Sequence, residues 1–362
     1  MKTQSILNFF RGSKNKPGSK TKQEKSKNKK FRFAERIVNR RDIVKGLAIL
    51  PFVGPAILSK ATGKEWISFE EQNLKDRLRG TGKTGPGSTE ALSPDKPLKV
   101  PHAKIKDLEI SRMILGGNLI GGWAHSRDLV YVSDLVKKYF NDEKVFETFA
   151  AAEKFGINAF LTNPILCRVI NEYWKRDLGK IKFISDGGFN PFEGVPQSVD
   201  NGACACYVHG GAADIMVQNG KVDDIGKAVE LIRKYKIPAG IGAHNLATVK
   251  ACVDKGIVPD FWMKTIHHTN YWSANKENQN DNIWCTDPEE TKEFMKNLKQ
   301  PWIGYKTLAA GAIDPKVGMR YAFENGADFI CVGMFDFQIQ DDVITVVEIL
   351  NSDIKRERPW MA

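Results

Sequence analysis

Histidines are few in this 362-residue chain, and most of them stand where an apolar run gives way to polar sequence. His209, His244 and His267 each end one of three successive runs of this kind. Three imidazoles and a carboxylate such as Asp186 can bind Zn²⁺ or another divalent ion and leave one position open for water or substrate. The sequence therefore suggests a divalent-metal site. The alternative is that each imidazole is an ordinary hydrogen-bonding group on a loop.

Three charged side chains are candidate catalytic residues beside these histidines: Asp186, Lys306 and Lys264. Lys306 follows a later apolar run, where it could act as an acid or base or stabilise a negative charge. Lys264 lies inside an apolar run, where a dry setting lowers the pKa of an amine and makes it a Schiff-base nucleophile. The alternative for Lys264 is a lysine that extends toward solvent or pairs with a carboxylate.

Polar and aromatic residues that suit a hydroxylated ligand follow the same apolar runs. The segment "TNYWSANKENQNDNIWCTDPEE" (269–290) is long, polar and aromatic, and could form a lid over a site. Aromatic faces beside amide donors suit carbohydrate-like ligands, although an ordinary surface loop would have the same composition. The candidate substrate-binding residues are Asn118, His125, Asn163, Asn245, Trp272 and Trp284.

Short β-rich runs alternate with amphipathic segments from Lys104 onward. Eight strand and helix units over about 250 residues predict an α/β fold of the (β/α)₈ (TIM) barrel type. An open doubly wound sheet is the alternative, but no glycine-rich dinucleotide fingerprint follows the first run. The predicted strands are 111–118, 157–164, 181–188, 203–211, 239–245, 260–268, 302–311 and 329–337.

Helical periodicity is visible between several of these strands. The predicted helices lie in 143–156, 224–237, 246–257, 287–300 and 315–327. Active sites of such barrels lie at the carboxyl ends of the strands, where the candidate residues fall. We therefore expect these residues to gather at one rim of the barrel.

The positive charge of the chain is confined to its start. Residues 1–45 contain 15 Lys and Arg against 3 Asp and Glu, whereas the remainder contains 39 against 40. The remainder is therefore near neutral and carries no electrostatic footprint for DNA or RNA. The segment 11–30 is polar, basic and almost free of apolar side chains, so we expect a disordered leader.

A further pattern follows within the leader. Arg40 and Arg41 precede a mostly apolar run at 46–58, and small residues follow at Ser59 and Ala61. This order resembles a bacterial twin-arginine export signal. The resemblance implies the translocation machinery as a partner and a periplasmic or otherwise exported protein, cut after Ala61 or kept as a membrane anchor. The alternative is a basic amphipathic helix.

The apolar run is shorter than the ~20 residues that a membrane-spanning helix needs, so no stable span is expected in the mature protein. A stretch rich in Gly, Pro and Ser follows it and is typical of a linker. The expected organisation is a basic leader at 1–63, a linker at 64–103 and a barrel domain at 104–362.

Four segments give the barrel region a likeness to a known family. They are "KIKDLEISRMILGGNLIGG" (104–122), "EKFGINAFLTNP" (153–164), "AGIGAHNLATVKACVDKG" (239–256) and "GMRYAFENGADFICVGMFDFQIQDDV" (318–343). Together they resemble the first strand, the second strand, a strand–turn–helix unit and the final cofactor-loop region of aldo/keto reductases. The resemblance covers about 104–345 and implies a (β/α)₈ barrel with NADP as cofactor.

The resemblance does not extend to the catalytic tetrad of that family. The family has Asp and Tyr after the second strand, Lys after the third and His after the fourth. Here the second strand ends at Asn163 without either residue, the third ends at Asp186, and only His209 fits. Without the tyrosine acid and its lysine, hydride transfer to a carbonyl lacks its proton donor.

Three functions follow from these observations. The first is an exported, metal-dependent lyase, isomerase or hydrolase that acts on a small polar substrate such as a sugar derivative. The second is a nicotinamide-dependent reductase with altered catalytic residues. The third is a barrel that binds a ligand without catalysis.

Overall fold

The computed structural model describes residues 98–124, 129, 131–274 and 283–362. The predicted twin-arginine leader, the predicted linker up to residue 97 and His125 lie outside the described residues. The chain divides into two units, Met1–Ser88 and Thr89–Ala362, and the second contains everything that follows. Within it, no described helix has both the length and the apolar character needed to span a bilayer.

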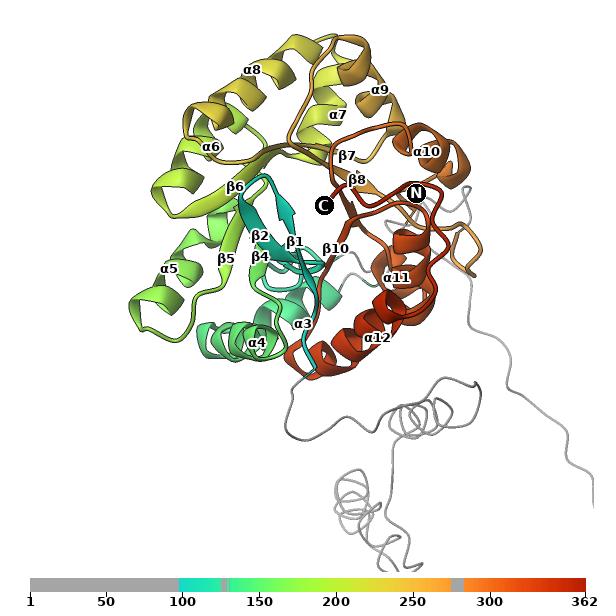
Figure 1. The fold of residues 1–362 in the computed structure, drawn as a ribbon. Coiled ribbons are helices and arrows are strands. Elements are labelled where there is room, and N and C mark those ends of the chain that lie inside the picture. Colours follow the sequence, from blue (N-terminus) through green and yellow to red (C-terminus); the bar gives the residue numbers. More distant parts are fainter. Residues whose placement is uncertain (1–97, 125–128, 130, 275–282) are drawn as a thin grey trace, which may run out of the picture. The chain divides into compact units, whose positions relative to one another are not determined.

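Eight parallel strands close into a barrel, which confirms the predicted fold class (Figure 1). All eight lie within the predicted strand ranges, although each is shorter. The strands pair in chain order, and β10 closes the ring against β3. They are β3 (Met113–Gly116), β4 (Ala159–Thr162), β5 (Lys182–Ser185), β6 (Ala203–Val208), β7 (Ala239–Ala243), β8 (Phe261–Thr265), β9 (Trp302–Tyr305) and β10 (Phe329–Val332).

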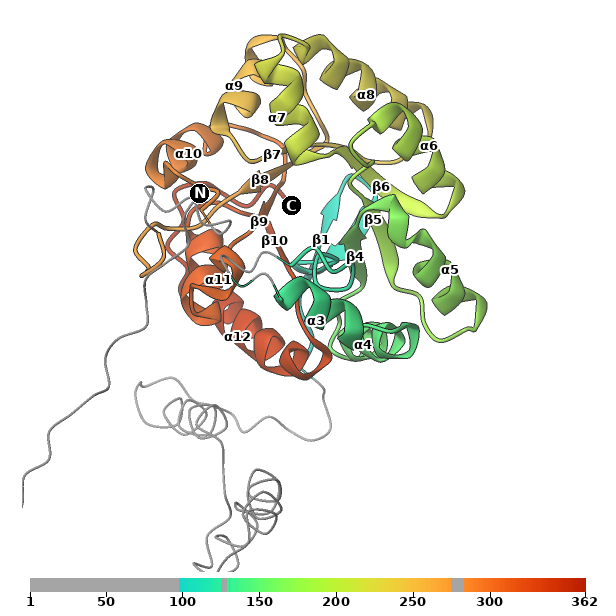
Figure 2. The same cartoon turned by 180° about the vertical axis from the view of Figure 1, so that it is seen from behind.

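Ten α-helices of the described residues form the outer layer (Figure 2). The five predicted helical segments correspond to α4, α8, α9, α10 and α11. The periodicity missed α3, α5, α6, α7 and α12. The helices are α3 (Val132–Tyr139), α4 (Asp142–Lys154), α5 (Cys167–Lys175), α6 (Pro191–Asp200), α7 (Gly210–Gln218), α8 (Val222–Lys234), α9 (Leu246–Asp254), α10 (Pro288–Met295), α11 (Pro315–Glu324) and α12 (Ile339–Asn351).

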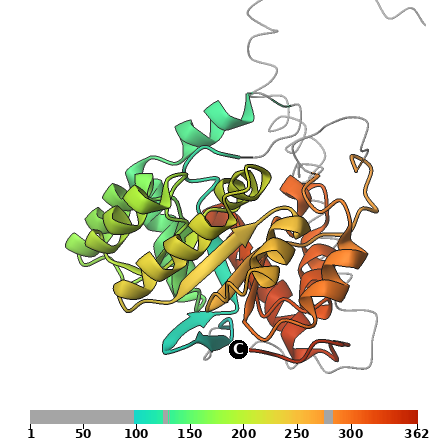
Figure 3. The same ribbon diagram turned by 90° about the horizontal axis from the view of Figure 1, so that it is seen from above.

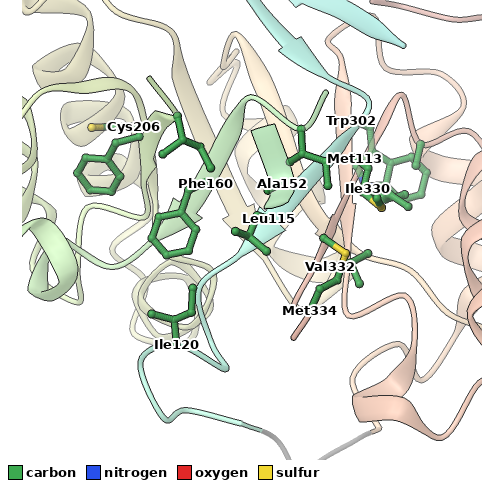
Figure 4. Packing of buried hydrophobic residues seen from close by; sticks show 14 of the residues in the cluster. Met113, Leu115, Ile120, Ala152, Phe160, Cys206, Trp302, Ile330, Val332 and Met334 are labelled. Atoms are coloured by element: carbon green, nitrogen blue, oxygen red, sulfur yellow. The ribbon is translucent and has the colours of Figure 1, made fainter. Parts of the chain in front are cut away.

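Alternate residues of each strand face two separate hydrophobic clusters, as period-2 geometry requires. The larger cluster fills the layer between barrel and helices, where Leu115, Phe160 and Val332 pack together (Figure 4). The smaller cluster fills the barrel interior and includes Ile184 and Met263. This alternation tells which strand residues face the axis and which face the helices.

The amino-terminal end of the barrel is closed. A hairpin of β1 (His102–Ile105) and β2 (Leu108–Ser111) inserts Ile105 and Ile110 into the interior cluster. The carboxyl-terminal tail ends beside this hairpin (Figure 3), where Arg112 donates to the Ala362 carbonyl oxygen at 2.9 Å. The opposite rim, at the carboxyl ends of the strands, is therefore the end at which a ligand can enter.

Candidate active site at the carboxyl rim of the barrel

Asp186 and His209 lie at the centre of the rim. Each directly follows a barrel strand and continues its series of interior-facing residues, Ile184 in β5 and Tyr207 in β6. Asp186 is only 8% exposed. Its Oδ1 accepts hydrogen bonds from the Gly188 main chain at 2.8 Å and from Asn163 Nδ2 at 2.9 Å. Burial raises the pKa of this carboxyl, and the nearby His209 and these hydrogen bonds oppose the rise. The second oxygen, Oδ2, faces His209.

His209 turns one ring nitrogen toward the first turn of α7 and the other toward Asp186. Its Nδ1 accepts from the main-chain N–H of Ala212 at 3.3 Å and so caps the start of α7. An acceptor Nδ1 in a neutral imidazole places the proton on Nε2. Nε2 lies 4.0 Å from Asp186 Oδ2, and the ring packs against Phe189. A donor and a carboxylate oxygen thus face each other at a separation longer than a direct hydrogen bond.

His244 is held by Asp214, a residue of α7 that the sequence reasoning missed. Asp214 Oδ2 accepts from the main-chain N–H of His244, and it also pairs with His244 Nδ1, both at 3.1 Å. Asp214 Oδ1 accepts from the Thr248 hydroxyl at 2.6 Å. The only signal in the sequence was an acidic residue on an otherwise apolar stretch, "GGAADIMVQ", following His209. A buried carboxylate in such a helix needs partners, and here they come from the start of α9.

Burial and hydrogen bonding act on this pair in opposite directions. Burial raises the pKa of Asp214, but the hydrogen bonds from His244 and Thr248 outweigh it, so the pKa lies below its ordinary value. Burial lowers the pKa of His244, and the charge of Lys306 adds to this, while Asp214 opposes it. His244 is therefore a neutral imidazole at neutral pH, with Nδ1 as its donor to Asp214.

Tyr305 adds a buried hydroxyl at the same rim. A β-carbon at position Gly210 would lie 2.6 Å from the Tyr305 hydroxyl and 3.1 Å from His244 Cε1, so a glycine permits this close approach. The hydroxyl has no hydrogen-bond partner within the described part of the chain. Burial raises the pKa of Tyr305 well above its ordinary value, so the phenol stays protonated. Tyr305 was not among the predicted site residues, although it lies within the predicted strand 302–311 next to Lys306.

Three of the predicted site residues lie together at the rim: Lys306, Trp284 and His244. The Lys306 ammonium lies 4.2 Å from the centre of the Trp284 ring, which is a cation–π distance. The Trp284 ring in turn lies 4.6 Å from the ring of His244. Lys306 has a left-handed backbone with φ of 57°, which is uncommon for a residue with a side chain. The Trp284 ring therefore holds the charged Lys306 ammonium close to the neutral imidazole of His244.

His267 belongs to the scaffold of the rim, and its geometry does not fit the predicted role of metal ligand. It is 0% exposed, and its Nε2 accepts from the main-chain N–H groups of Trp284 at 3.2 Å and Cys285 at 2.9 Å. Its Nδ1 donates to the carbonyl of His268 at 2.9 Å. Burial lowers the pKa of His267 to about 4. Both ring nitrogens are thus committed to the backbone, and no lone pair is left for an ion.

The three histidines consequently do not assemble as the sequence suggested. In 98–124, 129, 131–274 and 283–362, no group of three or more His, Cys, Asp or Glu side chains could hold a metal ion. His209 faces Asp186, His244 faces Asp214, and His267 fastens the segment before α10. The residues present do not fit the three-histidine zinc site.

Lys264 lies outside the barrel, on the face of β8 that it shares with Trp262 and Ile266. Both of these neighbours pack in the layer between barrel and helices, whereas Phe261 and Met263 face the interior. Lys264 is 1% exposed, and its Nζ donates to the carbonyl and hydroxyl oxygens of Thr265. It cannot serve a substrate on the barrel axis, so the rim site does not include it.

The remaining predicted substrate-binding residues lie at the rim with different exposures. Asn163 contacts Asp186 directly, while Asn118 and Asn245 are exposed on the loops after β3 and β7. Trp272 is 77% exposed on the loop after β8. His125 lies outside the described residues.

Comparison with known proteins identifies the fold and no family. No protein-family model matches the sequence, and no curated protein matches it. Two structures named as aldo-keto reductases from Pseudomonas aeruginosa superpose with TM-scores of 0.51 and 0.50, at 13% and 14% identity. Each alignment covers 71% of this chain, and 98% and 99% of those chains. At this identity the similarity shows a shared barrel fold alone.

Proposed function

We propose that the protein is an enzyme that moves protons on a small hydroxylated carbonyl compound, such as a sugar derivative, at the Asp186–His209 pair. The observation that carries this proposal is the 4.0 Å separation between His209 Nε2 and Asp186 Oδ2 at the open rim. A substrate oxygen or an acidic C–H group that approaches both atoms from the side would meet His209 Nε2–H as a donor and Asp186 Oδ2 as an acceptor. This arrangement suits isomerase or lyase chemistry.

Each member of the pair has a separate role in this proposal. Asp186 is the base, because burial raises its pKa and makes its carboxylate a better proton acceptor. Asn163 and the Gly188 N–H occupy Oδ1 and leave Oδ2 for the substrate. His209 donates its Nε2 proton to the substrate oxygen, while the Ala212 N–H holds its tautomer. The charge of Lys306 favours a developing oxyanion nearby.

Exposed aromatic side chains on the rim loops support a sugar-like substrate. Aromatic faces contact the apolar faces of sugar rings while the hydroxyl groups bond to polar neighbours. Phe189 is 67% exposed although it packs against His209, so it offers a free face beside the pair. Further exposed aromatics after the barrel strands are Trp123 and Trp272 on the loops after β3 and β8, Phe192 in the first turn of α6 and Phe337 in the short 3-10 helix after β10.

Export by the twin-arginine route is part of the same proposal. Its support is the order of Arg40, Arg41, the apolar run and the small residues in the sequence. Export by this route would place the substrate outside the cytoplasm. Subcellular fractionation of the full chain, compared with an Arg40→Lys, Arg41→Lys variant, tests it.

A nicotinamide-dependent reductase is the second candidate, because His209 occupies the position after the fourth barrel strand that the resemblance assigns to histidine. The two candidates differ in their need for a hydride carrier. Proton exchange at carbon proceeds without NADPH, whereas reduction requires it.

The proposal is tested by exchange with deuterated water. A panel of C3–C6 aldoses and ketoses is incubated with the protein in D₂O, and deuterium at carbon is followed by NMR. We expect Asp186→Asn and His209→Gln each to lower the exchange rate by roughly 10²–10⁴-fold. Lys227→Gln, on the exposed face of α8, is the matched control. Unchanged exchange in Asp186→Asn would remove the basis of the proposal.

A further inference from the structure

A cavity lies outside the barrel, between α7, α9 and the segment that enters α10. Its volume is about 440 Å³, which is within the usual range for a small-molecule site. Its walls include Asp214, Ala247 and Thr248 on the helices, and Cys285 on the segment before α10. Lys264 forms part of the wall on the barrel side.

The hydrogen bonds of Lys264 match an amine better than an ammonium ion. Its Nζ donates to the Thr265 carbonyl at 3.0 Å and to the Thr265 hydroxyl at 2.7 Å. The Thr265 hydroxyl donates its own hydrogen to the His244 carbonyl, so it must accept from Lys264. Two acceptors satisfy the two hydrogens of a neutral amine, and the nitrogen lone pair remains. An ammonium ion would have a third N–H to satisfy.

In the described part of the chain no carboxylate pairs directly with Lys264, and the charge of Asp214 compensates an ammonium there only in part. The acidic residues on the cavity wall have other partners: Asp214 binds His244 and Thr248, Glu290 binds Lys250, and Asp287 accepts from the main chain of Glu290. A buried ammonium without a paired carboxylate is costly, so the neutral amine forms at lower pH than in an exposed lysine. Burial accordingly lowers the pKa of Lys264 to about 8.

We propose that Lys264 is a nucleophilic amine that binds a small aldehyde or ketone as an imine in this outer cavity. The site is distinct from the Asp186–His209 pair and does not depend on its chemistry. Thr248 and the main chain at the start of α9 would bind hydroxyl groups of the carbonyl compound. An anionic compound is disfavoured, because Asp214, Asp287 and Glu290 line the same cavity.

The covalent step balances without a further reactant. The Lys264 nitrogen adds its lone pair to the carbonyl carbon, and a carbon–nitrogen bond forms. The carbonyl oxygen then leaves as water together with the two hydrogens of the amine, which gives the imine. No atom is oxidised or reduced.

Reductive trapping tests the proposal on the full-length protein. The protein is incubated at pH 7.5 with glyceraldehyde or dihydroxyacetone and sodium cyanoborohydride, and modified lysines are mapped by peptide mass spectrometry. We expect occupancy at Lys264 at least about tenfold above that of exposed lysines, since an amine of lowered pKa is less protonated. Occupancy at Lys264 equal to or below that of Lys250 would overturn the proposal.

Three variants make the result specific to the cavity. Lys264→Met should lose the adduct, while Lys250→Arg, at a partly exposed lysine of α9 that pairs with the cavity residue Glu290, should keep it. Ala247→Trp fills the cavity from the exposed start of α9 without changing Lys264, so it should lower the labelling several-fold. Full labelling in a folded Ala247→Trp protein would show that the carbonyl compound does not bind there. Asp186→Asn should leave the labelling unchanged, which separates this site from the rim site.

Discussion

Asp214 binds His244 twice, once through the histidine main chain and once through its ring, with 3.1 Å in both contacts. One carboxylate therefore fixes both the backbone after β7 and the orientation of the imidazole above it. The same carboxylate accepts from the Asn245 main chain at 3.3 Å and from the Thr248 hydroxyl. It thereby holds the residues that lead into α9, whose N-cap Asn245 supplies no side-chain hydrogen bond to the helix.

Replacing Asp214 with Ala should therefore destabilise the protein and displace His244. The variant leaves several buried donors without an acceptor, and each unsatisfied donor costs roughly 1–3 kcal/mol. Urea unfolding gives the free-energy difference. Asp224→Ala, which removes an exposed carboxylate from an i,i+3 pair on α8, is the control with an expected effect near zero. Equal stability of the two variants would show that the hydrogen bonds of Asp214 do not stabilise the fold.

Asp186→Asn should stabilise the protein at neutral pH while it removes the proposed base. Because burial raises the pKa of Asp186 in the folded state, its carboxylate lowers the stability once the pH exceeds the unfolded value of 3.8. An asparagine oxygen can still accept from Asn163 and Gly188. Urea unfolding from pH 3 to 8 should show a gain that grows with pH. A loss of stability at pH 7 would show that the charged form is stabilised in the folded protein.

Lys264→Met should change how stability depends on pH. The pKa of Lys264 falls from 10.5 to about 8 on folding. The unfolded state therefore holds more protons between these two values, and wild-type stability from this group rises with pH across that window. Lys264→Met should be more stable at pH 7 by roughly 3 kcal/mol at most, from 1.36 kcal/mol per pKa unit. The gain should disappear above pH 10, and denaturant unfolding across this range measures it.

Arg358→Ala should unfold the closed end of the barrel. Arg358 is 2% exposed and pairs with buried Asp328 at 2.7 Å, and Asp328 also accepts from the main chains of Trp302 and Met361. Removing one partner of a buried ion pair typically costs roughly 3–5 kcal/mol. Breaking an exposed pair costs about a tenth of that. Arg320→Ala, in the partly exposed pair with Glu324, is the matched control. Similar melting temperatures for both variants would contradict a structural role of the tail.

Zinc should not stabilise the described domain. Because both ring nitrogens of His267 bind the backbone, the three histidines offer no common site. We expect stoichiometric Zn²⁺ and EDTA each to leave the melting temperature unchanged, because a ligand that binds the native state would raise it. A rise of several degrees with Zn²⁺ that disappears in His244→Ala would restore the metal site.

The barrel could be predicted from the sequence because its strands are apolar runs at regular spacing. The polar residues at the strand ends could be predicted for the same reason, and Asp186 and His209 do meet at the rim. The partners of these residues could not be predicted. Asp214 reaches His244 from a helix, and Trp284 reaches Lys306 across a loop, so both contacts depend on tertiary packing. The role of His267 depended on hydrogen bonds to main-chain atoms, which leave no trace in residue types.

The tail that ends at Ala362 lies beside the β1–β2 hairpin, at the closed end of the barrel. Both ends of the described domain thus emerge on the side away from the ligand entrance. A surface attachment or a fused partner joined there through a spacer after Ala362 leaves the entrance facing bulk solvent. Shortening the tail as far as Arg358 would instead destabilise the closed end of the barrel. The domain can therefore be extended at this point but not trimmed.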